Sequence, residues 1–373
     1  MLTALIFALF GALIGSFANV VVYRLPRGES VVFPGSHCPN CNHELGALEL
    51  VPILSWVALR GRCRSCRVPI SARYPLVEGL MALGFFALAL KFPLERYGVT
   101  VLPLLILFAL LLILSLIDLD TQLLPDVLTF PALAVALLGV LVYDPASGLP
   151  TVTGALYGAC LGAGILALLN RVGALLLRRF RDTRERLWPV GMDQVGIAAL
   201  FGTVDWRAGG LAAALAVGLN LLTRRTLRLP EPLLYTLWFL AVVLLSFIHA
   251  EPLSALSESL VAAGGIAVVG AVYWWLHDRG NPEELMAEED DEPVAMGFGD
   301  VKLAAVLGAF LGWQLALVGL LLAFIFGAVG GVIGKALGKG RVVPFGPYLV
   351  LGAYAALFLG TPLLAWYLGL LGV

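Results

Sequence analysis

Long apolar runs recur along this 373-residue chain and constrain its fold more than any other feature. Residues 1–23 alone could cross a bilayer, because a helix of about 20 apolar residues spans the hydrocarbon core. Hydrophobic residues make up 60% of the chain and charged residues 13%, a composition that excludes a soluble globular domain of this size. Repeated apolar runs favour helices, which satisfy their own backbone hydrogen bonds in lipid. The sequence therefore predicts an all-α polytopic membrane protein.

We expect about 10–12 transmembrane helices from the number of apolar runs. The shortest runs could instead be half-helices or re-entrant segments. The first run has no basic stretch before it and no small-residue cleavage site after it, so we expect a retained helix rather than a removed signal peptide. The runs cover residues 1–23, 76–91, 99–117, 127–143, 152–177, 194–205, 208–222, 233–249, 254–276, 301–312, 314–334 and 346–371.

Basic residues indicate the orientation of these helices. The polar segment 24–75 carries seven arginines, and the positive-inside rule puts it in the cytosol with the N-terminus outside. Alternation then places the arginine-rich loop 178–192 in the cytosol as well, together with the ends of the runs that carry Asp118 and Asp300. The acidic stretch 281–293 is expected to be a solvated linker. No basic strip outside the membrane-flanking loops suggests a nucleic acid partner.

Four of the five cysteines lie in the segment 24–75 as two C-x-x-C pairs. Such paired knuckles are typical of a closed, structural four-thiolate zinc site. Two disulfides are the alternative, although the cytosol keeps thiols reduced. His37 and His43 flank the first pair and are spare ligand candidates. We predict a small zinc-stapled cytosolic loop domain whose metal ligands are Cys38, Cys41, Cys63 and Cys66.

Two aspartates lie where a long apolar run meets a polar stretch. Asp118 stands in SLIDLD, and Asp300 ends GFGD. An ionisable group at such a position is costly in lipid and is usually functional. Taken alone, Asp300 could simply cap a helix, as Asp126 is expected to do after a proline. Two carboxylates brought together could share one proton, activate a water and hydrolyse a peptide bond.

An internal similarity complicates the region between these aspartates. GMDQVGIAALFG at 191–202 aligns with GFGDVKLAAVLG at 297–308. Gln194 stands at the position of Asp300, so we interpret the first copy as inactive and Asp300 as the working residue. Asp193, one position earlier, is the less favoured substitute. Chance similarity between helices rich in small residues is the alternative explanation.

These motifs resemble those of the bacterial type IV prepilin peptidases, which are membrane aspartic proteases of the GxGD type. The matching stretches occur in family order along nearly the whole chain: GSFANVVVYRLPRGES, CPNC, CRSC, RYPLVEG, SLIDLDTQLLPD, GFGDVKLAAVLGAFLGW and PFGPYLVLGAY. The resemblance implies that Asp118 and Asp300 are catalytic and that the four cysteines hold zinc. It also implies cleavage of prepilin and pseudopilin precursors, with short basic leaders, on the cytosolic side of the inner membrane.

Many members of that family also methylate the new N-terminus with S-adenosylmethionine, an activity associated with the cysteine-bearing N-terminal region. This chain departs from the family pattern between about 180 and 295. A proton-coupled transporter with an intramembrane carboxylate pair and a non-enzymatic assembly factor are the rival interpretations. We expect a first transmembrane helix, the zinc loop, helices carrying Asp118, a duplicated or inserted segment, and helices carrying Asp300, at residues 1–23, 24–75, 76–177, 178–295 and 296–373.

Overall fold

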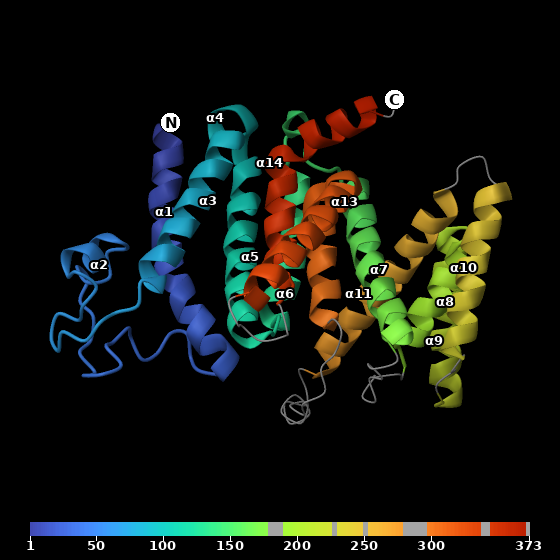
Figure 1. Ribbon diagram of the computed structural model, residues 1–373, viewed down its shortest axis with the longest axis horizontal. Coiled ribbons are helices and arrows are strands. Elements are labelled where there is room, and N and C mark those ends of the chain that lie inside the picture. The colour runs from blue at the N-terminus through green and yellow to red at the C-terminus, as the bar shows by residue number, and fades with distance from the viewer. Residues whose placement is uncertain (178–188, 226–229, 249–252, 279–296, 337–343, 371–373) are drawn as a thin grey trace. The chain divides into compact units, whose positions relative to one another are not determined.

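The protein is helical in its computed structural model, which describes residues 1–177, 189–225, 230–248, 253–278, 297–336 and 344–370 (Figure 1). This part of the chain contains no strand, and its two isolated β-bridges both lie in the cysteine-bearing loop. The predicted all-α class is confirmed. Most of the basic loop and the whole acidic stretch, residues 178–188 and 281–293, lie outside the described residues.

Seven of the described helices are long and apolar enough to cross a membrane. This supports a multi-pass membrane protein, with fewer such helices than the 10–12 expected. Some predicted runs form helices that are too short, because the 11 residues of α8 reach only about 16 Å, roughly half of the hydrocarbon core. The seven are α1 (Leu2–Arg24), α3 (Arg73–Lys91), α5 (Val101–Thr121), α7 (Val152–Leu177), α11 (Ser254–Asp278), α13 (Phe298–Ala336) and α14 (Gly346–Leu370).

The remaining helices are shorter or less apolar. The runs 301–312 and 314–334 were expected to be two separate helices. They form the single helix α13 with a break at Gly312, whose φ of 70° is left-handed. Asp126 is the first residue of α6 rather than its N-cap, which is Pro125. The other α-helices are α2 (Leu54–Ala58), α4 (Leu94–Tyr97), α6 (Asp126–Gly139), α8 (Met192–Gly202), α9 (Trp206–Thr223) and α10 (Glu231–Ile248).

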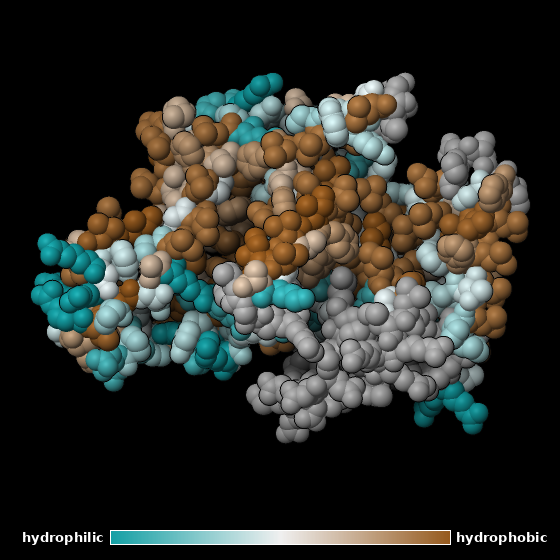
Figure 2. All heavy atoms as spheres, in the orientation of Figure 1, coloured by the Kyte–Doolittle hydropathy of each residue, from teal (hydrophilic) through white to brown (hydrophobic). Residues whose placement is uncertain are grey.

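The chain divides into two compact units, and α14 contributes its first turn to one and its remainder to the other. Unit 1 comprises residues 1–149 and 342–350, and unit 2 comprises residues 150–341 and 351–373. In unit 1, α1, α3 and α5 pack side by side (Figure 1). Figure 2 shows hydrophobic residues over α1 and α3 and hydrophilic residues around the cysteine loop. This distribution is expected of helices that face lipid beside a loop that faces water.

Glycines allow the helices of unit 1 to approach closely. A Cβ atom on Gly15 of α1 would lie 2.7 Å from the Cα atom of Glu78 on α3. A Cβ atom on Gly11 would lie 2.8 Å from the backbone oxygen of Met81. These two glycines are four residues apart, the small-xxx-small spacing that lets membrane helices pack backbone to backbone. The α1–α3 contact therefore depends on both positions remaining glycine.

In unit 2, α7 packs between α13 and α11. A Cβ atom on Gly158 of α7 would lie 2.2 Å from the backbone oxygen of Gly308 on α13. One on Gly164 would lie 1.9 Å from the backbone oxygen of Leu260 on α11. Helix α8 packs against α9, α10 and α11. Glycines on two faces of α7 thus allow both α13 and α11 to pack with their backbones against the backbone of α7.

Candidate functional site

Asp118 lies in the last turn of α5 and is 5% exposed. Its Oδ2 atom accepts a hydrogen bond of 2.9 Å from the backbone N–H of Gly346, the first residue of α14. The first N–H groups of a helix have no partner within the helix, and the macrodipole there favours a negative charge. The start of α14 therefore provides a preformed donor for this carboxylate, and both residues belong to unit 1.

Gly346 also has to be glycine for steric reasons. A Cβ atom at this position would lie 2.7 Å from the Oδ2 atom of Asp118 and 3.2 Å from its Cγ atom. The sequence PFGPY at 344–348 thus has a structural role that sequence reasoning did not assign to it. Only the family order of the motifs suggested that this stretch matters.

Asp118 lies near the end of its helix, whereas Asp300 lies near the start of another, as the third residue of α13. It is 8% exposed, and its backbone N–H donates to the oxygen of Gly297 at 3.1 Å. A carboxylate in the first turn is stabilised by the helix macrodipole. Asp300 belongs to unit 2, whereas Asp118 belongs to unit 1, and the predicted pairing of the two carboxylates stays a prediction.

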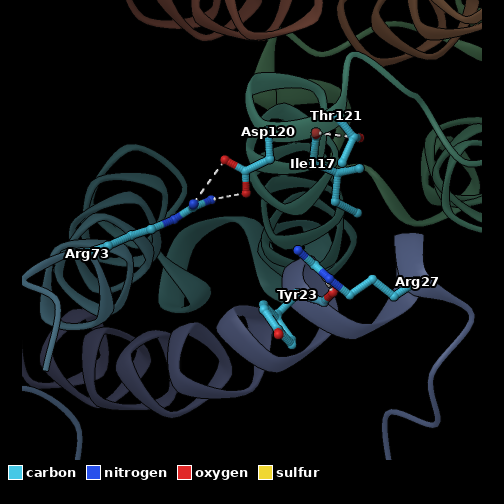
Figure 3. A network of polar contacts seen from close by, with 6 residues as sticks. All are labelled: Tyr23, Arg27, Arg73, Ile117, Asp120 and Thr121. Atoms are coloured by element: carbon cyan, nitrogen blue, oxygen red, sulfur yellow. Dashed lines mark hydrogen bonds and ion pairs between the residues drawn. The ribbon is translucent and has the colours of Figure 1, made fainter. Parts of the chain in front are cut away.

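A bidentate ion pair lies two residues beyond Asp118 in the chain (Figure 3). The two guanidinium nitrogens of Arg73, at the start of α3, donate to the two carboxylate oxygens of Asp120 at 2.9 Å and 2.6 Å. The guanidinium group of Arg27 lies 4.0 Å above the Tyr23 ring nearby on α1. The pair ties the end of α5 to the start of α3, and both side chains are partly exposed to solvent.

The four cysteines lie together in the loop between α1 and α3. All four Sγ atoms are within 4.8 Å of one another, with Cys38 to Cys66 at 3.8 Å and Cys41 to Cys63 at 4.0 Å. Four sulfurs bound at about 2.3 Å to a tetrahedral ion would be about 3.8 Å apart. A disulfide would need about 2.05 Å, and none of the four is disulfide-bonded. The cluster could therefore hold a metal ion, and the disulfide alternative was wrong.

The two knuckles have the same backbone geometry. In the first, the Cys38 N–H donates to the oxygen of His43 at 2.9 Å, and Asn42 has a left-handed φ of 55°. In the second, the Cys63 N–H donates to the oxygen of Val68 at 2.9 Å, and Arg67 has a φ of 62°. Such turns direct both thiols of a knuckle to one side, as chelation of a single ion requires.

The surroundings of the thiols and of the two histidines favour the cysteines alone as ligands. The Val68 backbone N–H and then the Asn40 side chain lower the pKa of Cys66 to about 6, which favours the thiolate form. His43, a spare candidate from the sequence, instead pairs with Glu49 at 3.1 Å. His37 hydrogen-bonds the oxygen of Gly35 at 3.0 Å. Among the described residues, the only metal-ligating cluster consists of the four cysteines.

The first copy of the internal similarity forms the start of α8. Gln194 is 1% exposed, and its side-chain oxygen accepts a hydrogen bond from the Gly191 N–H at 2.7 Å. Asp193 is 7% exposed. The side chain at the position that aligns with Asp300 thus closes its own helix end, which is a structural role.

Glu78 is a buried carboxylate that sequence reasoning missed. It lies in RYPLVEG on α3, and its Oε2 atom accepts a hydrogen bond of 2.7 Å from the Ile53 N–H. Ile53 has a left-handed φ of 62° and immediately precedes α2. An acidic residue inside a predicted membrane helix is the signal that could have found it.

Family models match the regions that contain the cysteine cluster, Asp118 and Asp300. Residues 9–92 match the bacterial peptidase A24 N-terminal domain. Residues 105–181 and 211–332 match the type IV leader peptidase family, and these two stretches include more than half of the chain. The chain belongs to the type IV leader peptidase family. The match covers both Asp118 and Asp300, and residues 182–210, which contain Gln194, lie outside it.

Several relatives are named prepilin leader peptidase/N-methyltransferase. The protein of Aeromonas hydrophila is 29% identical over 96% of this chain and 92% of its own length. That of Burkholderia pseudomallei is 35% identical over 60% of this chain and 78% of its own length. That of Myxococcus xanthus is 41% identical over 54% of this chain and 58% of its own length. The transporter interpretation is not favoured by these matches, and no solved structure matches the chain.

Proposed function

We propose that this member of the leader peptidase family is a membrane aspartic endopeptidase that removes the short leader of type IV prepilin-like precursors. Asp118 and Asp300 are the catalytic pair in this proposal. The observation that carries it is the burial of Asp118 against the Gly346 N–H at the start of α14, within a chain that matches the family over both aspartates. Burying a carboxylate in a membrane protein costs free energy, so a buried carboxylate with a dedicated donor usually has a function.

The chemistry follows from placing two carboxylates together at low dielectric. They cannot both ionise easily, so one keeps its proton while the other acts as a base. The base takes a proton from a water that attacks the scissile carbonyl, and the acid donates its proton to the leaving amine. The Gly346 N–H orients Oδ2 of Asp118. Its Oδ1 has no hydrogen-bond partner among the described residues, and we assign the water to that oxygen.

Asp300 is the second catalytic residue, rather than Asp193. The family match includes Asp300 and omits residues 182–210. The neighbouring Gln194 is engaged with the Gly191 N–H. We therefore propose that the duplicated segment within 178–295 is catalytically inactive.

The metal ion held by Cys38, Cys41, Cys63 and Cys66 is zinc in this proposal. Four thiolates at tetrahedral separation suit Zn²⁺ and leave no open coordination position. Its role is to stabilise the fold of the loop 24–75. That loop has few buried apolar residues of its own and would fold poorly without such a staple.

The same chain is proposed to methylate the new N-terminus with S-adenosylmethionine. Support comes from the match to the A24 N-terminal domain over residues 9–92 and from relatives named as methyltransferases. We propose the inner membrane as the location, with the N-terminus outside and both aspartates facing the cytosol. The basic segment 24–75 supports this orientation. The substrates are prepilin and pseudopilin precursors.

Incubating the purified full chain with a prepilin precursor and S-adenosylmethionine tests both activities in one mass spectrum. We expect loss of the leader and a gain of one methyl group. Asp118→Asn and Asp300→Asn should abolish cleavage, whereas the buried control Asp193→Asn should retain it. Activity that survives Asp300→Asn and is lost with Asp193→Asn would overturn the assignment.

A further inference from the structure

The short helix α2 in the cysteine loop presents an apolar face that no described part of the chain covers. Leu54 is 68% exposed and Val57 is 59% exposed. Residues three apart lie on the same face of a helix, and exposed Ala58 extends that face. Two large aliphatic side chains exposed side by side in a polar loop indicate an interaction surface.

The opposite face of α2 is anchored, which fixes the orientation of Leu54 and Val57. The indole N–H of Trp56 donates to the oxygen of Ile70 at 3.1 Å. The Trp56 ring packs against Gly61, where a Cβ atom would lie 2.7 Å from the ring. Since Trp56 points into the loop, the helix cannot rotate to bury its aliphatic face without breaking these contacts.

A hydrogen bond also fixes where α2 lies along the membrane helix α3. The Ile53 N–H, just before α2, donates to Glu78. Glu78 is five residues into α3, about 7.5 Å from its start at 1.5 Å per residue. Leu76 and Leu80, next to this turn of α3, have exposed side chains. The start of α2 is therefore held beside the first turns of α3, where that helix also exposes leucines.

The charges next to α2 favour one partner. Four arginines follow the helix closely, all are exposed, and none forms an ion pair within the described part of the chain. The segment 24–75 contains seven arginines, no lysine or aspartate, and three glutamates, which gives it a net charge of +4. An anionic partner is attracted by this surface, whereas a basic peptide leader is repelled. The four arginines are Arg60, Arg62, Arg64 and Arg67.

We propose that α2 and these arginines dock the cysteine loop onto the anionic phospholipid surface of the bilayer. Leu54 and Val57 enter the boundary between headgroups and acyl chains, as the apolar face of an interfacial helix does. The guanidinium groups contact lipid phosphates, which they bind through several N–H donors at once. The lipid surface thus holds the loop against the same membrane that contains α3.

Hydrogen exchange of the full chain in lipid nanodiscs tests this docking. The discs contain phosphatidylcholine alone or phosphatidylcholine with phosphatidylglycerol, and the readout is the exchange of backbone amides in residues 54–67. We expect roughly tenfold slower exchange in the anionic discs, and the difference should shrink at high salt. It should also be lost in the Arg60→Gln, Arg62→Gln, Arg64→Gln variant and in the Leu54→Asn, Val57→Asn variant.

Two controls make the result specific. Arg96→Gln removes an exposed arginine beyond the other end of α3 and should leave the lipid effect unchanged. Metal content should be equal in all variants, which excludes unfolding of the loop. Cleavage in detergent should also be unchanged, so the docking can fail without affecting the proposed peptidase. Equal exchange in both kinds of disc, or protection that arises only when precursor is added, would overturn the proposal.

Discussion

Replacing Gly346 by alanine should impair catalysis by displacing the carboxylate of Asp118. The added Cβ atom would lie 2.7 Å from Oδ2, closer than real contacts allow, and 3.2 Å from Cγ. Either the Asp118 side chain or the first turn of α14 must therefore shift. Both movements lengthen the 2.9 Å hydrogen bond between the Gly346 N–H and Oδ2.

The size of the effect follows from that hydrogen bond. A hydrogen bond to a charged group contributes about 1.5–3 kcal/mol, and about 1.4 kcal/mol changes a rate tenfold. If the bond serves mainly to orient the catalytic oxygen, kcat should fall roughly 10- to 150-fold. KM should change little, because the substitution removes no contact assigned to the substrate.

Cleavage kinetics of the full chain with a prepilin precursor provide the assay. Gly79→Ala on α3 is the matched control, since a Cβ atom there meets nothing within 4 Å, and it should leave kcat unchanged. A double-mutant cycle separates the clash from general unfolding. Gly346→Ala should lower the stability of the Asp118 protein, but should cost little when Asp118 is itself alanine. Wild-type kcat for Gly346→Ala, or equal stability costs in both backgrounds, would refute the reasoning.

Two further predictions concern unit 1. The purified chain should contain one zinc ion, and the metal retained after dialysis should decline as the solution is made acidic, because protons compete with the metal for the four thiolates. Metal retention by elemental analysis that stays flat from neutral pH down to about pH 4 would contradict this. Arg73→Asp or Asp120→Arg alone should lower the free energy of unfolding by up to about 1 kcal/mol, since the pair is partly exposed. In denaturation of the purified chain, the double reversal should recover part of that loss.

Local patterns in the sequence predicted the helices and the cysteine cluster. An apolar run indicates a membrane helix by its length alone. Two C-x-x-C pairs form one metal site as soon as the chain between them folds back and brings them together. The boundary between the predicted runs 301–312 and 314–334 falls beside the break at Gly312, although the two runs form one helix. Length also accounts for the main difference, since apolar runs such as that of α8 form helices too short to cross a membrane.

Contacts between distant residues could not be predicted in the same way. The Gly346–Asp118 hydrogen bond joins residues 228 positions apart, and the Ile53–Glu78 bond joins residues 25 apart. Neither has a local signal, because a glycine or a glutamate looks the same whatever it contacts. The pairing of Asp118 with Asp300 is of the same kind and stays a prediction, resting on the chemistry that two carboxylates can share.

The packing of unit 2 explains how this chain can carry a long segment before its second aspartate. Helix α7 precedes α8 in sequence, yet its Gly158 meets Gly308 of α13, the helix that begins near Asp300. Its Gly164 meets α11, which in turn covers α8 and α9. The helix that carries Asp300 therefore packs on one face of α7, and α11, with α8 and α9 behind it, packs on another. Because the two faces are separate, changes in the additional segment such as Gln194 leave the Gly158–Gly308 contact between α7 and α13 in place.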